Sequence, residues 1–155
     1  MGFQMIVRIL YISLGGNTRH FIKKMQAYAQ THSTVEIDAE EITDASFDKL
    51  EQAPFFALVP TYLDGGNGID NGVKEIMTNP LFEQIEYQNN RDQLIGVVGS
   101  GNKNFNIQYV LTARRYGDYF DAPVIGDYEL RGTDQDVERI FNALVQRLEE
   151  YTQAN

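Results

Sequence analysis

The chain contains no cysteine among its 155 residues, and this absence excludes several kinds of redox chemistry. Without thiols it cannot exchange disulfides, hold an iron–sulfur cluster through cysteine or build a cysteine-ligated zinc site. Any redox activity therefore needs electrons carried by a bound cofactor. A chain of this length buries enough surface to be stable without disulfides or metal, and we expect a single domain over residues 1–155.

Basic residues are scarce as well, because 13 Lys and Arg stand against 22 Asp and Glu, which gives a net charge of −9. Such a surface disfavours nucleic acid as a partner and favours a small molecule or another protein. The longest apolar run, Met5 to Ile12, is interrupted by Arg8 and is far shorter than the roughly 20 residues that span a bilayer. We therefore expect a cytoplasmic protein that does not bind membranes.

Three short apolar segments predict buried strands at 6–12, 55–59 and 94–98. Their hydrophobicity is continuous rather than alternating, which is typical of parallel strands covered on both faces. Weaker strand candidates are 34–37 and 124–128. Helical periodicity predicts helices over 18–30, 108–120 and 134–148, the last with Thr133 as its N-cap, and a short helix around 73–77. This alternation predicts an α/β fold with right-handed crossovers and helices on both faces of the sheet.

Three loops follow the strong strands, at the edge where open α/β sheets bind ligands. The first, residues 13–18, combines small hydroxyls and glycines with the start of a helix. That combination is typical of a phosphate site, and also of an ordinary strand-to-helix turn capped by Thr18. The loop matches neither GxxxxGK[ST] nor GxGxxG, which leaves the phosphate of a mononucleotide as the candidate ligand.

The second and third loops, 60–68 and 99–105, each combine glycines with one aromatic residue, Tyr62 or Phe105. A flat heterocycle held between two loops needs a ring to stack on and free backbone N–H and C=O groups for its polar edge. Packing of each aromatic ring beneath its own loop is the alternative. The coincidence of all three loops at one sheet edge favours a heterocyclic mononucleotide.

These loops resemble those of a known family. Residues 13–18 are similar to the flavodoxin loop that binds the phosphate of FMN. The strings Ser-Gly-Asn-Lys-Asn-Phe at 100–105 and Glu-Leu-Arg-Gly-Thr at 129–133 resemble the NrdI family, flavodoxin-like proteins that serve class Ib ribonucleotide reductase. The resemblance covers essentially the whole chain. It implies a flavodoxin-like three-layer fold with a five-stranded parallel sheet of order 2-1-3-4-5, and FMN as the cofactor.

The resemblance also assigns FMN contacts to individual residues. Contacts to the phosphate fall on Ser13, Gly16, Asn17 and Thr18, and Gly15, where many relatives have a hydroxyl, keeps its backbone donor in the same loop. Contacts to one side of the flavin fall on Thr61, Tyr62, Gly65 and Gly66. Contacts to the other side fall on Gly99, Ser100, Gly101, Asn102, Asn104 and Phe105.

In this family, reduced FMN reacts with O2 to give superoxide or a related oxidant, which is passed to the dimanganese site of the radical subunit, where a tyrosyl radical forms. The resemblance therefore implies that radical subunit, O2 and a flavin reductase or similar electron donor as partners. It implies an accessory factor with its chemistry on the flavin rather than a conventional turnover enzyme. Alternatives are an electron-shuttle flavodoxin and a flavin-free interaction module. With only His20 and His32 and no Glu-x-x-His pair, we expect no metal site in the chain itself.

The acidic charge is concentrated in residues 36–51, where seven carboxylates and one lysine give −6, and we interpret this segment as a solvated sheet edge. The loops expected around the flavin are near neutral, with Asp64 in one and Lys103 in the other. A neutral rim disfavours an anionic reduced flavin less than an acidic rim does. We therefore expect Lys103 to modulate the flavin site by favouring superoxide or carboxylates of the partner; an ordinary solvated lysine is the alternative.

Overall fold

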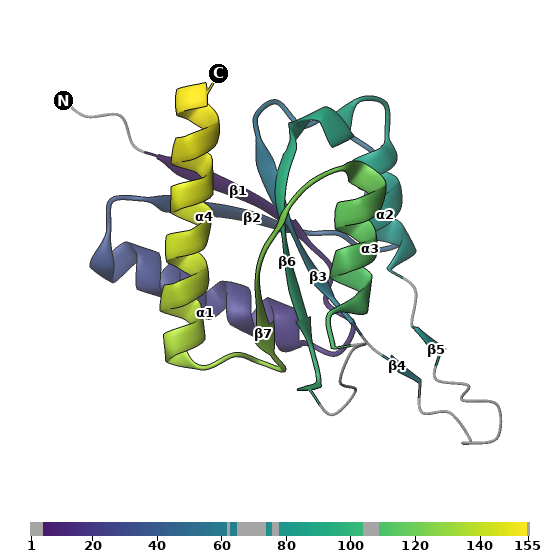
Figure 1. Ribbon diagram of the computed structural model, residues 1–155, viewed down its shortest axis with the longest axis horizontal. Helices are drawn as coiled ribbons and strands as arrows, with labels where there is room; N and C mark the ends of the chain where they lie inside the picture. Colours follow the sequence, from purple (N-terminus) through teal and green to yellow (C-terminus); the bar gives the residue numbers. More distant parts are fainter. Residues whose placement is uncertain (1–4, 62, 65–73, 76–77, 104–108, 155) are drawn as a thin grey trace.

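The computed structural model describes residues 5–61, 63–64, 74–75, 78–103 and 109–154 (Figure 1). Five parallel strands form one sheet: β1 (Ile6–Tyr11), β2 (Glu36–Glu41), β3 (Phe55–Pro60), β6 (Leu94–Gly101) and β7 (Val124–Glu129). Their order is β2-β1-β3-β6-β7, and all neighbours pair in parallel. Counting only these five strands, this is the predicted order 2-1-3-4-5, and the α/β prediction is confirmed.

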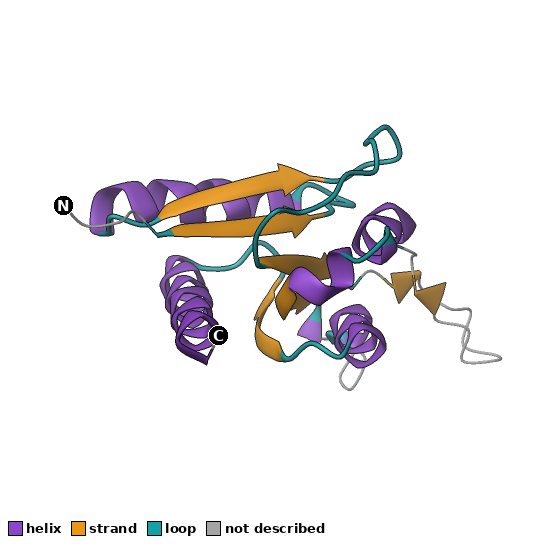
Figure 2. Cartoon of the chain, turned by 90° about the horizontal axis from the view of Figure 1, so that it is seen from above, coloured by secondary structure: helices purple, strands orange, loops and turns teal. Residues whose placement is uncertain are grey.

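Helices cover both faces of this sheet, as the sequence predicts. They are α1 (Asn17–His32), α2 (Asn79–Glu86), α3 (Leu111–Phe120) and α4 (Asp134–Ala154), with a short 3-10 helix η1 (Asn90–Gln93) before β6. Figure 2 shows α1 and α4 on one side of the sheet and α2 and α3 on the other. Each layer encloses its own apolar core, one around Phe21 and Ile140 and the other around Leu81 and Ala113. The three-layer prediction is therefore confirmed.

The prediction of a short helix around 73–77 is wrong. Lys74 and Glu75 instead form β5, which pairs antiparallel with β4 (Leu63–Asp64), and the helix of this region begins at Asn79. Pro80 lacks a backbone N–H and has a φ suited to the first helical turn, so it fixes the start of α2 beyond the predicted segment. The apolar residues Leu81 and Ile85, one turn apart, then face the core.

Two strands differ from their predicted bounds by more than one residue. The weak candidate 34–37 becomes β2, which runs on to Glu41. It is an edge strand with only Ile37 buried, so its sequence carries little of the apolar signal of a central strand. The third strong strand does not end at residue 98, because β6 continues through Gly101, pairing Ser100 with Pro60 on one side and Tyr128 on the other.

The acidic segment 36–51 is more than a solvated edge. Arg8 on β1 points its guanidinium at Glu51, Glu40 and Asp38, with N···O distances of 2.9, 2.7 and 3.4 Å. The Glu51 side chain is only 3% exposed. Its hydrogen bond holds the pKa of Arg8 above the ordinary value. The solvated-edge interpretation is therefore wrong for Glu51, while Asp38 and the two aspartates of the following loop are exposed.

Within the described part of the chain, no helix combines the length and the apolar character needed to cross a membrane.

The predicted N-cap of the last helix, Thr133, is confirmed by a reciprocal pair of hydrogen bonds. The Asp136 N–H donates to the Thr133 hydroxyl at 3.1 Å, and the Thr133 N–H donates to the Asp136 carboxylate at 2.8 Å. This capping box fixes where α4 begins and thus how the turn before it is presented.

Candidate functional site

The loop from β1 into α1 holds the five residues expected at a phosphate. Gly16 is the N-cap of α1 and has a φ of 88°, a left-handed conformation that favours glycine. Ser13 accepts a hydrogen bond at its hydroxyl from the Arg19 N–H at 3.2 Å. Gly15 is exposed and Asn17 opens the helix. The loop therefore turns sharply enough to present the first N–H groups of α1 at the carboxyl edge of the sheet.

Apart from the Ser13 hydroxyl that accepts the Arg19 N–H, the start of α1 has few side-chain partners for its N-terminal donors. No acidic residue lies in the first turn, and the N-cap supplies no side-chain hydrogen bond. Thr18 is 1% exposed, and its hydroxyl oxygen has no hydrogen-bond partner among the described residues. An unpaired buried hydroxyl costs free energy, so this atom is a candidate ligand group that the fold itself leaves unused.

The ends of β3 and β6 are joined at Thr61. Its N–H donates to the Ser100 carbonyl at 2.7 Å, and its hydroxyl accepts the N–H of Thr112 at 2.9 Å. Thr112 lies in the first turn of α3, so the Thr61 hydroxyl satisfies one of the donors at that helix start. Thr61 and Ser100 are thus brought together, both buried, at the edge where the predicted loops meet.

The glycines at the end of β6 allow close packing against α3 and the residues before it. A Cβ on Gly99 would lie 2.7 Å from the Cβ of Ala113, and one on Gly101 would lie 1.9 Å from the backbone oxygen of Tyr109. The Gly101 carbonyl accepts the Leu130 N–H at 2.9 Å. These glycines therefore lie within β6 rather than in a free loop, and the Gly101 carbonyl is already used there.

Beyond β6, Asn102 is half-buried and Lys103 is exposed. The Lys103 N–H donates to the Glu129 carboxylate at 3.1 Å, and its ammonium lies 5.5 Å from the centre of the Tyr109 ring. Burial, reinforced by the nearby carboxylate of Asp127, raises the pKa of the Tyr109 hydroxyl. Glu129 thus ties the backbone of the third predicted loop to the turn between β7 and α4.

Asn17 of the first loop and Lys103 of the third line one hollow of about 630 Å³ with the β7–α4 turn. The turn residues Glu129 and Leu130 had no role in the sequence prediction beyond their place in a motif. The string at 129–133 is the one feature of the sequence that pointed to these two residues, and no pattern in it indicates that Glu129 contacts Lys103, 26 positions away.

Five predicted site residues lie outside the described residues: Tyr62, Gly65, Gly66, Asn104 and Phe105.

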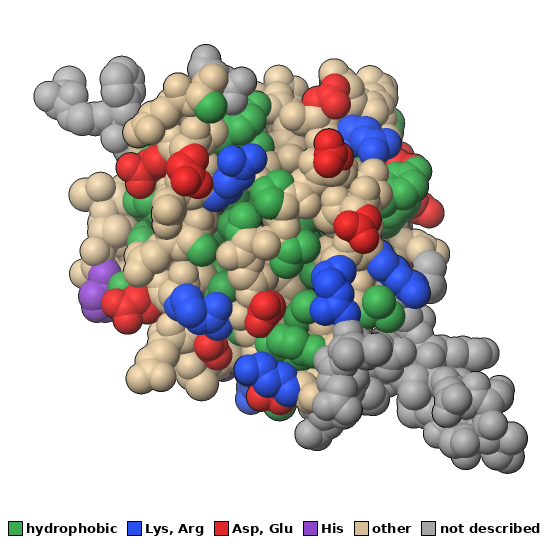
Figure 3. Space-filling model, in the orientation of Figure 1, with side chains coloured by type: hydrophobic (Ala, Val, Ile, Leu, Met, Phe, Trp, Pro, Cys, Tyr) green, Lys and Arg blue, Asp and Glu red, His purple; other side chains and the backbone are tan. Residues whose placement is uncertain are grey.

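Charges on the face shown in Figure 3 are interspersed, with basic, acidic and apolar side chains side by side. The local balance at the hollow agrees with this view, because its lining includes three basic and three acidic side chains: Lys103, Arg131, Arg139, Asp127, Glu129 and Asp136. The excess of acid lies elsewhere, in the segment that carries β2. The lining of this hollow is therefore electrostatically mixed.

The family comparison covers most of the chain. A family model described as NrdI flavodoxin-like matches residues 9–142. An NrdI-like protein of Streptococcus pyogenes serotype M18 is 46% identical over 143 residues, which are 90% of this chain and 93% of that protein. The protein NrdI of Bartonella bacilliformis is 31% identical over 129 residues, 83% of this chain and 87% of the relative.

Solved structures resemble the fold at lower sequence identity. A short-chain flavodoxin associated with a PDU bacterial microcompartment aligns with a TM-score of 0.63 at 16% identity, covering 95% of this chain and 99% of the other. Oxidised flavodoxin 2 from Bacillus cereus aligns with a TM-score of 0.59 at 17% identity, covering 94% and 99%. These likenesses agree with the sheet order and the two helical layers.

Proposed function

Because the chain belongs to the NrdI flavodoxin-like family, an FMN-binding group linked to ribonucleotide reductase, we propose that it supplies a superoxide-type oxidant to the dimanganese radical subunit of a class Ib enzyme. When bound and reduced, FMN supplies the electrons for one-electron reduction of O2 to superoxide. The protein's part is to bind the cofactor, orient it and dock the partner. The family match over 9–142 carries this proposal, since it spans the ligand loops and the 129–133 string together.

The β1–α1 loop would hold the FMN phosphate. The left-handed Gly16, the positive end of the α1 dipole and the unpartnered Thr18 hydroxyl all suit an anion. Asn17 and Gly15 would add backbone donors, while the Ser13 hydroxyl already accepts from Arg19 and would keep a proton to donate. A phosphate here would satisfy donors that the fold leaves open, so the residues present fit the group.

The flavin would lie between the residues that follow β3 and those that follow β6. The carbonyls of Ser100 and Gly101 already accept hydrogen bonds from Thr61 and Leu130. Gly99 and Gly101 would therefore serve the site by letting β6 pack closely against α3. Polar contacts to the flavin would fall to Asn102 and the residues after it, with Tyr62, Gly65, Gly66, Asn104 and Phe105 as the remaining proposed contacts.

Two measurements test the proposed function in order. Apoprotein titrated with FMN is expected to bind it with a shifted visible spectrum and quenched flavin fluorescence. The FMN-loaded, reduced protein is then mixed with manganese-loaded radical subunit and O2, and a tyrosyl radical is expected in the electron paramagnetic resonance spectrum. Failure to bind FMN would favour a flavin-free interaction module, and flavin binding without radical formation would favour an electron-shuttle flavodoxin.

A further inference from the structure

The turn between β7 and α4 holds a large apolar residue in an unfavourable conformation. Leu130 has a φ of 56°, which lies in the left-handed region that bulky residues rarely adopt. Its side chain is 47% exposed, so much of it does not contribute to packing in either core. A glycine would adopt this φ without strain. Retaining leucine here points to a use for the side chain outside the fold, since strained residues cluster at functional sites.

Hydrogen bonds to three neighbouring elements hold this turn in place. The Leu130 N–H donates to Gly101 at the end of β6, and the Gly132 N–H closes the turn onto the Glu129 carbonyl. The Lys24 ammonium on α1 reaches the Gly132 carbonyl at 3.4 Å. The Glu129 side chain accepts the Lys103 N–H. The Leu130 side chain is therefore presented by a fixed backbone, which lowers the entropy that a partner must remove on binding.

Two exposed cations, Lys103 and Arg131, line the same hollow as Leu130. Neither Lys103 nor Arg131 forms an ion pair with a carboxylate among the described residues, and the guanidinium of Arg131 lies 3.4 Å from His20 instead. The nearby acids are already engaged, because Asp136 holds Thr133 and Arg139, and Glu129 holds Lys103 through its backbone. The carboxylates here thus have partners within the chain, while the Lys103 ammonium contacts only the Tyr109 ring, at 5.5 Å from its centre, and neither cation has a carboxylate partner among the described residues.

We infer that Leu130, Lys103 and Arg131 form a docking surface for the radical subunit, one that fits an apolar recess bordered by Asp or Glu side chains. This inference rests on the proposed function and names the contact through which the partner would be recognised. The chain as a whole is strongly acidic, whereas the hollow beside Leu130 balances three basic side chains against three acidic ones, so an acidic partner surface is repelled less here than elsewhere. Because Glu129 links the turn to Lys103, docking contacts and the loop after β6 belong to one connected unit.

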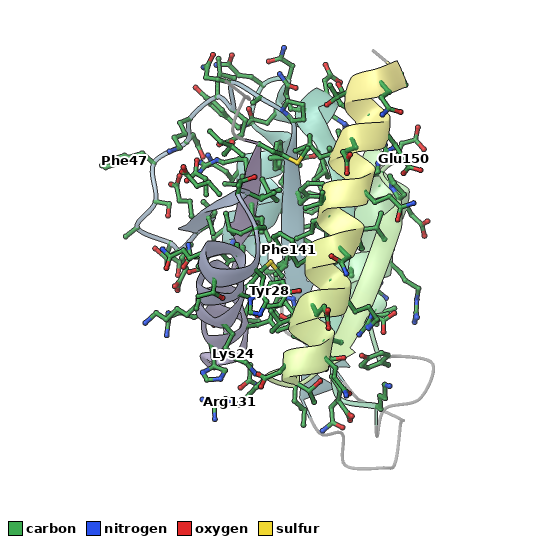
Figure 4. All side chains as sticks on the ribbon, turned by 90° about the vertical axis from the view of Figure 1, so that its left-hand side faces the viewer. Lys24, Tyr28, Phe47, Arg131, Phe141 and Glu150 are labelled. Carbon is green, nitrogen blue, oxygen red and sulfur yellow. The ribbon has the colours of Figure 1, made fainter. Side chains whose placement is uncertain are left out.

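The chain offers a matched control for this surface. Phe47 is 90% exposed, and in Figure 4 it projects from the upper left of the molecule, whereas Arg131 projects from the bottom. Phe47, like Leu130, is an exposed apolar residue, but it lies away from the turn that carries Arg131. A substitution at Phe47 removes more exposed apolar surface than one at Leu130, without touching the proposed contact.

The test measures binding of the FMN-loaded full-length chain to the manganese-loaded radical subunit by isothermal titration calorimetry. Leu130→Gly and Leu130→Asp are expected to weaken binding about tenfold or more, as for an interface anchor, while the FMN dissociation constant stays unchanged. Lys103→Glu and Arg131→Glu are expected to weaken binding most at low salt and to flatten its salt dependence. Phe47→Asp is expected to bind as the wild type does.

Leu130→Gly should fold as the wild type does, because glycine adopts a positive φ without the backbone strain of leucine. A loss of binding in this variant therefore reports the missing side chain rather than misfolding. Wild-type affinity in both Leu130 variants would overturn the docking surface. If the wild type binds the radical subunit and generates the radical, that result leaves the proposed function standing. If the wild-type chain neither binds the subunit nor supports radical formation, the proposed function and the docking surface both fail.

Discussion

Two regions of the molecule use their charges in opposite ways. At the β2 edge, Arg8 is surrounded by three carboxylates, and Arg19 at the start of α1 pairs with Glu41 at 2.7 Å. At the β7–α4 turn, Lys103 and Arg131 lack such partners among the described residues. The first region is acidic in sequence and pairs four of its seven carboxylates with basic side chains, whereas the second is mixed in sequence and has two cations without a carboxylate partner among the described residues.

This difference separates charges that hold the fold from charges that remain for a partner. A buried carboxylate such as Glu51 is stable only while its guanidinium partner is present. An exposed lysine contributes little to stability and is free to interact across an interface. The charge counted along the sequence therefore does not show which charged side chains can contact a partner, because ion pairs between distant segments engage some of them within the fold.

The largest expected effect is the loss of Arg8. Arg8→Ala leaves the Glu51 carboxylate buried without its partner, so the free energy of unfolding should fall by about 3 kcal/mol. Urea denaturation followed by circular dichroism measures this loss. Lys103→Ala is the control and should unfold as the wild type does. Equal losses in both variants would contradict the contrast between the two regions.

Gly101→Ala tests the close packing at the end of β6. The added methyl group meets the Tyr109 carbonyl, so we expect a stability loss of about 2 kcal/mol together with about tenfold weaker FMN binding. FMN titration by fluorescence and urea denaturation measure the two effects. Gly15→Ala, at an exposed glycine without a positive φ, is the control for stability and should unfold as the wild type does. Wild-type FMN affinity in Gly101→Ala would separate this packing from the flavin site.

Thr18→Val should change stability and ligand affinity in opposite directions, raising the free energy of unfolding of the apoprotein and lowering its affinity for FMN. Removing the unpartnered hydroxyl should stabilise the apoprotein by about 1 kcal/mol, because an unsatisfied buried polar group disappears. FMN binding should weaken about fivefold if the phosphate uses this hydroxyl. Thr31→Val in the same helix, where the hydroxyl bonds the Ala27 carbonyl, is the control and should leave FMN affinity unchanged. A Thr18 variant with unaltered affinity removes this residue from the phosphate site.

The smallest effect concerns pH at the β2 edge. The Arg19 guanidinium lowers the pKa of Glu41 below its ordinary value of 4.5. A carboxyl group with a lowered folded pKa contributes stability above the unfolded pKa and loses it as pH falls through the folded pKa. The stability difference between wild type and Arg19→Ala should therefore be constant above pH 4.5 and shrink below it. A difference independent of pH would mean that this exposed pair contributes nothing.

Much of the fold could be predicted because its central strands are continuous apolar runs and three of its helices have a clear period. The edge strand β2 was weakly predicted because only Ile37 needs burial there. The helix expected at 73–77 failed because short helical periods are weak evidence, and pairing with residues 63–64 prevailed at Lys74 and Glu75. The turn from β1 into α1 was predicted, whereas the extension of β6 through Gly101 depended on pairing with both neighbours.

The absence of cysteine, the acidic balance and the order of strands and helices are properties of the sequence by itself. They excluded thiol chemistry and predicted a parallel sheet with loops at one edge. Only the tertiary structure decided that Arg8 meets Glu51, 43 positions away, and that Lys103 meets Glu129 through its backbone. Contacts between distant residues depend on strand register and helix packing, and no local pattern encodes them. The same packing left the Thr18 hydroxyl unpaired and held Leu130 exposed at a positive φ.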